Sequence, residues 1–227
     1  MFDYRNVVAV FVFFGFNLFG LASCTTYSNL TTAKTLERGE FELGVIGSGH
    51  FVGDSTFYGA GVSGRAGLNP WLDLGGKIET NFMPGGGYNP YATVTTADLK
   101  FGLLDEENKP LSLALMPGVS IGLINSNLMT TLLVSRRFGR WEPVFAYRPQ
   151  AIYFYGMKLE DDDDDDDGDD DDLLLISPGW GLQNDLFVGC RIQVAGPFHV
   201  FPEFGASINQ VGNAMFHVNV GLQFVFK

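Results

Sequence analysis

Long apolar runs are scarce in this 227-residue chain. Outside residues 7–22, no uninterrupted apolar stretch reaches the roughly 18 residues that a membrane-spanning helix requires. The run at 7–22 is itself short, and it is interrupted by Gly15, Asn17 and Gly20. The sequence therefore excludes a protein built from transmembrane helices.

Cysteine and histidine are also rare. The two cysteines are Cys24 and Cys190, so the chain has no disulfide framework. The three histidines are His50, His199 and His217, and none of them combines with a nucleophile and an orienting acid by type and spacing. We therefore expect no enzymatic activity and no catalytic residues.

Charged residues make up only 18% of the chain, and their imbalance is local. The formal net charge is −12, but 12 of the 26 acidic residues lie in residues 160–172. The remaining acidic residues equal the 14 Lys and Arg in number. A neutral body without a basic patch argues against nucleic acid as a partner.

Apolar residues alternate with small or polar residues over much of the chain, which predicts β-strands with two different faces. In the last stretch, Phe216, Val218 and Val220 share one face, while His217 and Asn219 share the other. The expected strands are residues 40–49, 57–68, 71–82, 92–104, 111–123, 129–138, 144–155, 187–195, 198–208 and 216–227.

The connections between these strands differ in length. Short turns are expected at residues 69–70, 105–110, 139–143 and 196–197, and longer or more polar loops between them. An even number of strands of about ten residues, with short turns on one side, is typical of bacterial outer-membrane barrels. We predict an all-β, antiparallel up-and-down transmembrane β-barrel of about ten strands, with 12 or 8 as alternatives, preceded by an N-terminal signal helix.

The C-terminal strand carries a motif of bacterial outer-membrane proteins. Asn219, Gly221, Phe224 and Phe226 resemble the β-signal of small outer-membrane barrels, although Lys227 leaves the last aromatic residue penultimate. The resemblance implies that the barrel-assembly machinery is a partner of this chain and reads these four residues as an assembly signal.

A second motif lies near the N-terminus. Leu21, Ala22, Ser23 and Cys24 follow an apolar run and resemble the bacterial lipobox. The resemblance implies a lipoprotein signal peptide at residues 1–23 and an acyl chain such as palmitate on Cys24, which would anchor the N-terminus in outer-membrane lipid. An ordinary signal peptide cleaved nearby is the alternative. Residues 24–38 are polar and unpatterned, so we interpret them as a tether to a barrel domain at 39–227.

Single charges of both signs stand among the glycines of the polar face. In a barrel this face lines a narrow lumen, where opposite charges neutralise each other and seal the interior. Two alternatives remain: a narrow pore or solute transporter, and a lipid-anchored soluble β-sandwich or lipocalin-like binding protein. The expected lumen charges are Glu42, Arg65, Asp73, Lys77, Glu79, Asp98, Lys100, Arg137, Arg148, Arg191 and Glu203.

The acidic residues fall in an expected external loop, 156–172. Asp163, Asp165 and Asp167 alternate before Gly168 as at the start of a calcium-binding loop, and Asp169 follows. We expect a solvated acidic repeat and no cofactor, with a loose Ca²⁺ or Mg²⁺ site at these residues as the alternative. The sequence as a whole predicts a non-enzymatic, lipid-anchored outer-membrane barrel that presents surface loops, and it predicts no oligomeric state.

Overall fold

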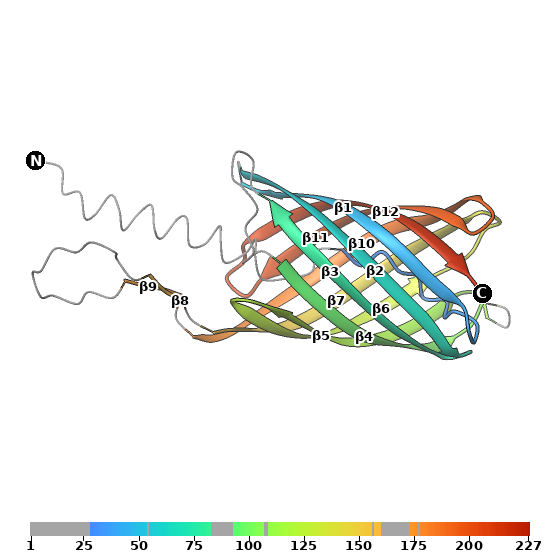
Figure 1. Ribbon diagram of the computed structural model, residues 1–227, viewed down its shortest axis with the longest axis horizontal. Coiled ribbons are helices and arrows are strands. Elements are labelled where there is room, and N and C mark those ends of the chain that lie inside the picture. Colours follow the sequence, from blue (N-terminus) through green and yellow to red (C-terminus); the bar gives the residue numbers. More distant parts are fainter. Residues whose placement is uncertain are drawn as a thin grey trace, which may run out of the picture.

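Ten strands of this computed structural model close into one antiparallel barrel (Figure 1). The structure describes residues 28–53, 55–82, 93–106, 109–155, 157–159, 173–176 and 178–227. The barrel strands are β1 (Phe41–Val52), β2 (Ser55–Asn69), β3 (Leu72–Phe82), β4 (Thr93–Leu104), β5 (Ser112–Gly122), β6 (Asn125–Ser135), β7 (Trp141–Phe154), β10 (Gly179–Ala195), β11 (Phe198–Asn209) and β12 (Ala214–Phe226).

Each barrel strand pairs with its neighbours along the chain, and β1 pairs with β12 to close the ring. The two remaining strands, β8 (Met157–Leu159) and β9 (Leu173–Ile176), form a separate two-stranded sheet between β7 and β10. The prediction of an up-and-down barrel with ten strands is therefore confirmed. The β-sandwich alternative is wrong, because all ten strands belong to one closed sheet.

The alternation of residues places apolar side chains outside and polar side chains inside. On β12, for example, Phe216 is 61% exposed and its neighbour His217 is 1% exposed. This arrangement inverts a soluble lipocalin-like barrel, whose interior is apolar. A broad exposed apolar surface of this kind needs a hydrocarbon environment.

Three expected strand boundaries are wrong. The polar stretch 125–127 was expected to form a turn, but it begins β6, where Asn125 and Asn127 point inward and hydrogen-bond each other. Pro143 was expected in a turn and lies within β7. The expected membrane strand at 187–195 begins earlier, because β10 pairs with β7 from Gly179 onward. Polar residues can continue a barrel strand because its inner face is itself polar.

The C-terminus lies at the end of the barrel that carries the turns before β3, β7 and β11 (Figure 1). Short connections occur at both ends, since only two residues separate β1 from β2, and β5 from β6, at the other end. The connection between β7 and β10, which contains the predicted acidic loop, leaves the opposite end. In the part of the chain that the structure describes, no helix has the length and apolar character needed to cross a membrane.

Candidate functional site: a plugged lumen

Residues 28–36 lie inside the barrel (Figure 1). Ser28, Thr32 and Ala33 are each at most 2% exposed, and Leu36 is also buried. A polar tether, as predicted for residues 24–38, does not account for this burial. We call residues 28–36 the plug, because they occupy space that the strands alone leave open.

The plug runs in the direction opposite to β1. At the end of the barrel where the C-terminus lies, the amide of Leu36 donates to Asp73 Oδ1 at 3.1 Å, and Thr35 donates to the carbonyl of Pro70. At the other end of the plug, Ser28 contacts Lys77 and Glu79 of β3. The chain therefore passes down the lumen and turns back at residues 37–40 to enter β1.

A buried carboxylate on β11 holds the N-terminal part of the plug. The two oxygens of Glu203 accept hydrogen bonds from the backbone amides of Asn29 and Leu30, at 2.9 and 3.0 Å. Glu203 also accepts from the Asn219 side chain at 2.9 Å. Leu30 has a φ of 41°, a left-handed conformation that L-residues adopt rarely. Charge-assisted hydrogen bonds from its own amide and from that of Asn29 hold this residue in place.

Inward-facing glycines make room for the plug. A Cβ atom at Gly221 would lie 3.1 Å from Leu30 Cδ1, and one at Gly102 would lie 3.2 Å from Thr35 Cγ2. Larger side chains at these positions would compete with the plug for the same volume. Eight strands leave space only for side chains, and ten leave more, which here holds a chain segment.

Below and around the plug, charged side chains form buried pairs. Arg148 binds Asp185 at 2.7 Å, with side-chain exposures of 2% and 0%. Lys100 binds Asp73 at 2.8 Å and also donates to the plug carbonyl of Lys34 at 2.7 Å. These pairs neutralise the lumen and hold the plug at the same time. The remaining barrel pairs are Arg65–Asp98, Lys77–Glu79, Arg191–Glu142 and Arg191–Glu42.

The structure places all but one of the expected lumen charges inside the barrel. Arg137 lies instead at the rim, where its backbone amide donates to Glu106 and its guanidinium to Gln193. Sequence reasoning missed Glu142 and Asp185, which are 3% and 0% exposed. Both share the inward parity of their strands, but the expected strands began too late to include them.

The four expected assembly-signal residues divide between the two faces of β12. Asn219 and Gly221 point inward, toward Glu203 and Leu30. Phe224 and Phe226 point outward and pack against Phe198 and Phe41, with ring centroids 5.1 and 6.2 Å apart. In the folded chain this motif therefore closes the barrel and accommodates the plug.

Two expected sites lie outside the described residues. These are the lipidation site at Cys24, with the signal peptide before it, and the cation site at Asp163, Asp165, Asp167 and Asp169. Both stay predictions.

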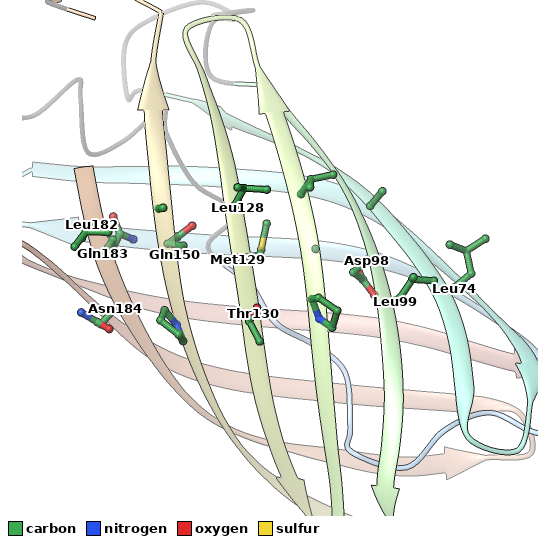
Figure 2. Close-up of a pocket in the computed structure, with 16 residues that line it drawn as sticks. Leu74, Asp98, Leu99, Leu128, Met129, Thr130, Gln150, Leu182, Gln183 and Asn184 are labelled. Carbon is green, nitrogen blue, oxygen red and sulfur yellow. The ribbon is translucent and has the colours of Figure 1, made fainter. Parts of the chain in front are cut away.

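A pocket with a volume of about 750 Å³ lies at the barrel wall. Figure 2 shows its labelled residues on neighbouring strands, from Leu74 on β3 to Leu182 on β10. The ladder between β4 and β5 passes from Asp98–Gly118 to Phe101–Leu115 beside this pocket, because Pro117 has no N–H to donate. Asp98 is the only titratable residue of the lining, and it is already paired with Arg65.

The fold brings together two histidines that lie far apart in the sequence. His50 and His217 lie opposite each other in register on β1 and β12, with their Nδ1 atoms 3.2 Å apart. Ser207 Oγ on β11 lies 2.7 Å from His217 Nε2. His199 lies elsewhere, next to the carbonyl of Pro197 in a short turn. The alternation of β1 and β12 predicts that both histidines face inward, but only the strand register reveals that they meet.

The position of the plug can be tested by thiol labelling. In a background with Cys24 and Cys190 replaced by Ser, we expect Ala33→Cys to resist a water-soluble maleimide in the folded barrel. Arg38→Cys, which lies just beyond the plug and is exposed, should react at least tenfold faster. Equal labelling rates would contradict a buried plug, and labelling after unfolding by heat in detergent controls for the reactivity of each thiol.

The fold and the lumen define a closed antiparallel β-barrel with an apolar exterior and a polar interior filled by its own chain. No protein-family model and no curated protein sequence matches this chain.

Several solved structures resemble it weakly. The N-terminal β-barrel domain of Pseudomonas aeruginosa OprF is 9% identical, with a TM-score of 0.36 over 83% of this chain and 100% of that chain. An outer membrane channel from Pseudomonas putida F1 is 11% identical, with a TM-score of 0.44 over 88% and 100%. Neisserial surface protein A is 7% identical, with a TM-score of 0.37 over 82% and 95%.

Proposed function

We propose that this protein is a non-enzymatic outer-membrane β-barrel that presents surface loops and keeps its lumen sealed with its own plug. The observation that carries this proposal is the set of hydrogen bonds between residues 28–36 and inward side chains of the wall. A segment held by Glu203 near one end, and by Asp73 and Lys100 paired across β3 and β4 near the other, occupies the path that a solute would follow.

The exterior supports a position in a membrane. Large apolar side chains such as Leu43, Val45 and Val62 are about half exposed on neighbouring strands. Ring closure leaves no strand edge with unpaired backbone groups, which a bilayer would not tolerate. Lipid contacts only the outer face, because the side chains that line the lumen are polar.

The N-terminal and loop predictions complete the proposal. Cys24 carries the lipid anchor, the barrel-assembly machinery inserts the chain, and the acidic loop binds Ca²⁺ or Mg²⁺ loosely at the cell surface. Each of these statements rests on the sequence motif that predicts it. Metabolic labelling with an alkyne-tagged fatty acid tests the anchor, since Cys24→Ser should abolish incorporation.

The proposed function is tested by fractionation and electrical recording. We expect the protein in the outer-membrane fraction, with migration on gels that changes on heating, as folded barrels show. The purified protein in planar bilayers should give no discrete conductance steps. A protein that stays monomeric and folded without detergent would contradict the membrane position, and steady steps would contradict the sealed lumen.

A narrow channel is the second candidate. One observation favours it: the plug is held by hydrogen bonds and buried contacts rather than being a wall strand, so it can leave without opening the ring. The lumen charges would then face water and select among small solutes. Conductance that begins only when the plug is displaced distinguishes this candidate from a permanently sealed barrel.

A further inference from the structure

Two buried imidazoles face each other across the seam that closes the ring. His50 and His217 are 2% and 1% exposed, and both point into the lumen. They lie on directly paired positions of β1 and β12, near the ends of these strands that are remote from the C-terminus. Their Nδ1 atoms are 3.2 Å apart, within hydrogen-bond distance, with donor and acceptor set by the tautomers of the two rings.

A polar side chain contacts the second ring nitrogen of His217, and another interacts with His50. Ser207 Oγ lies 2.7 Å from Nε2 of His217. The Asn81 side chain hydrogen-bonds to His50, and Nε2 of His50 and Oδ1 of Asn81 both lie beside Gly59. Histidines that bind metals almost always have the second ring nitrogen oriented by such a partner. The two rings are thus fixed in position before any ligand arrives.

The separation of the two Nδ1 atoms fits one metal ion bound to both. Zinc–nitrogen bonds of about 2.0–2.1 Å at a tetrahedral angle place two ligand nitrogens roughly 3.3 Å apart. The observed distance is 3.2 Å. We propose that His50 and His217 form a binding site for a divalent transition metal ion, with water molecules completing its coordination.

The ligand atoms determine which ions the site takes. Imidazole nitrogen suits Zn²⁺, Co²⁺, Ni²⁺ and Cu²⁺, whereas Ca²⁺ and Mg²⁺ require oxygen ligands. Within the described residues, no group of three or more His, Cys, Asp or Glu side chains is arranged around a metal ion, so the two imidazoles carry the selectivity.

The nitrogen–metal bonds are the main source of affinity at a site of two imidazoles. We therefore expect the usual affinity order of divalent transition metal ions, with Cu²⁺ bound more tightly than Zn²⁺.

The test is a titration of the purified, detergent-folded full chain with ZnCl₂ and CuCl₂ at pH 7.5, followed by calorimetry. We expect one saturable site in the wild-type protein and at least a tenfold loss of affinity in His50→Gln and in His217→Gln. The acidic loop is the same in all of these proteins, so any metal that it binds contributes an equal background. CaCl₂ should give no heat that depends on the histidines.

His199→Gln provides the matched control, because His199 lies near the start of β11, beside the turn that contains Pro197 and away from the pair. The metal affinity of this variant should equal that of the wild type. The proposal is overturned if the wild type binds no metal, or if His50→Gln and His217→Gln bind as tightly as His199→Gln does. Should either variant fail to fold, Cu²⁺ electron paramagnetic resonance of the wild type decides. A spectrum without coupling to imidazole nitrogen would overturn the site.

Discussion

Deleting residues 28–36 should convert a silent barrel into a conducting one. These residues fill the lumen of a ten-strand ring, and the ring itself closes through the β1–β12 pair without them. Once they are gone, water enters and hydrates the carboxylates and cations that the plug now covers. In planar bilayers we expect discrete conductance steps from the deletion variant and none from the full chain.

The control for this deletion keeps the plug and changes the residues just after it. Glu37→Ala with Arg38→Ala alters the exposed turn before β1, so this variant should stay silent. Both proteins must show the heat-dependent migration of a folded barrel before recording. A deletion variant that is folded and still silent would show that the side chains of the wall seal the lumen by themselves.

Removing the buried carboxylate of Asp185 should destabilise the barrel more than any other single substitution proposed here. Asp185 accepts from Arg148 Nε, Gln150 Nε2 and Gln183 Nε2, each at 2.8 Å. Asp185→Ala leaves the guanidinium of Arg148 buried without its counter-ion, and breaking such a pair costs about 3–5 kcal/mol. We expect a loss of this size in the free energy of unfolding, measured in urea with the protein in lipid vesicles.

An exposed ion pair gives the comparison for Asp185. Lys227 binds Glu37, and both side chains are more than half exposed. The hydrogen bond and the charge of Lys227 lower the pKa of Glu37, but water and salt screen a solvent-exposed pair, so it contributes little to stability. Glu37→Ala should therefore have little effect on unfolding. Equal effects of the two substitutions would mean that the lumen is hydrated and that Asp185 is not desolvated.

The strands were predictable because the alternation of residues within each strand shows which side chains face outward and which face inward. The alternation around Phe216 and His217 needs no information from elsewhere in the chain, so the faces of β12 follow directly from the sequence. The strand ends were less predictable, since Asn125 and Pro143 resemble turn residues and yet continue a strand. Their partners across the sheet, rather than their own preferences, decide where the strands begin.

The plug was not predictable in the same way. Residues 28–36 have no periodic pattern, and Glu203, which binds two of their amides, lies more than 170 residues away in sequence. The inward glycines are the one feature of the sequence that indicates the plug. A face with glycine at positions such as 102 and 221 indicates that something other than side chains occupies the space.

A backbone that passes through a closed ring of its own strands constrains the order of assembly. The ring has no gap, so residues 28–36 must be inside before the last pair of strands zips together, or the free N-terminal end must be threaded through afterwards. Gln223 of β12 donates to the carbonyl of Leu30, so the final strand holds the segment that it encloses. Any bulky group attached upstream of Ser28 would prevent late threading, and the barrel would then have to form around its N-terminal segment.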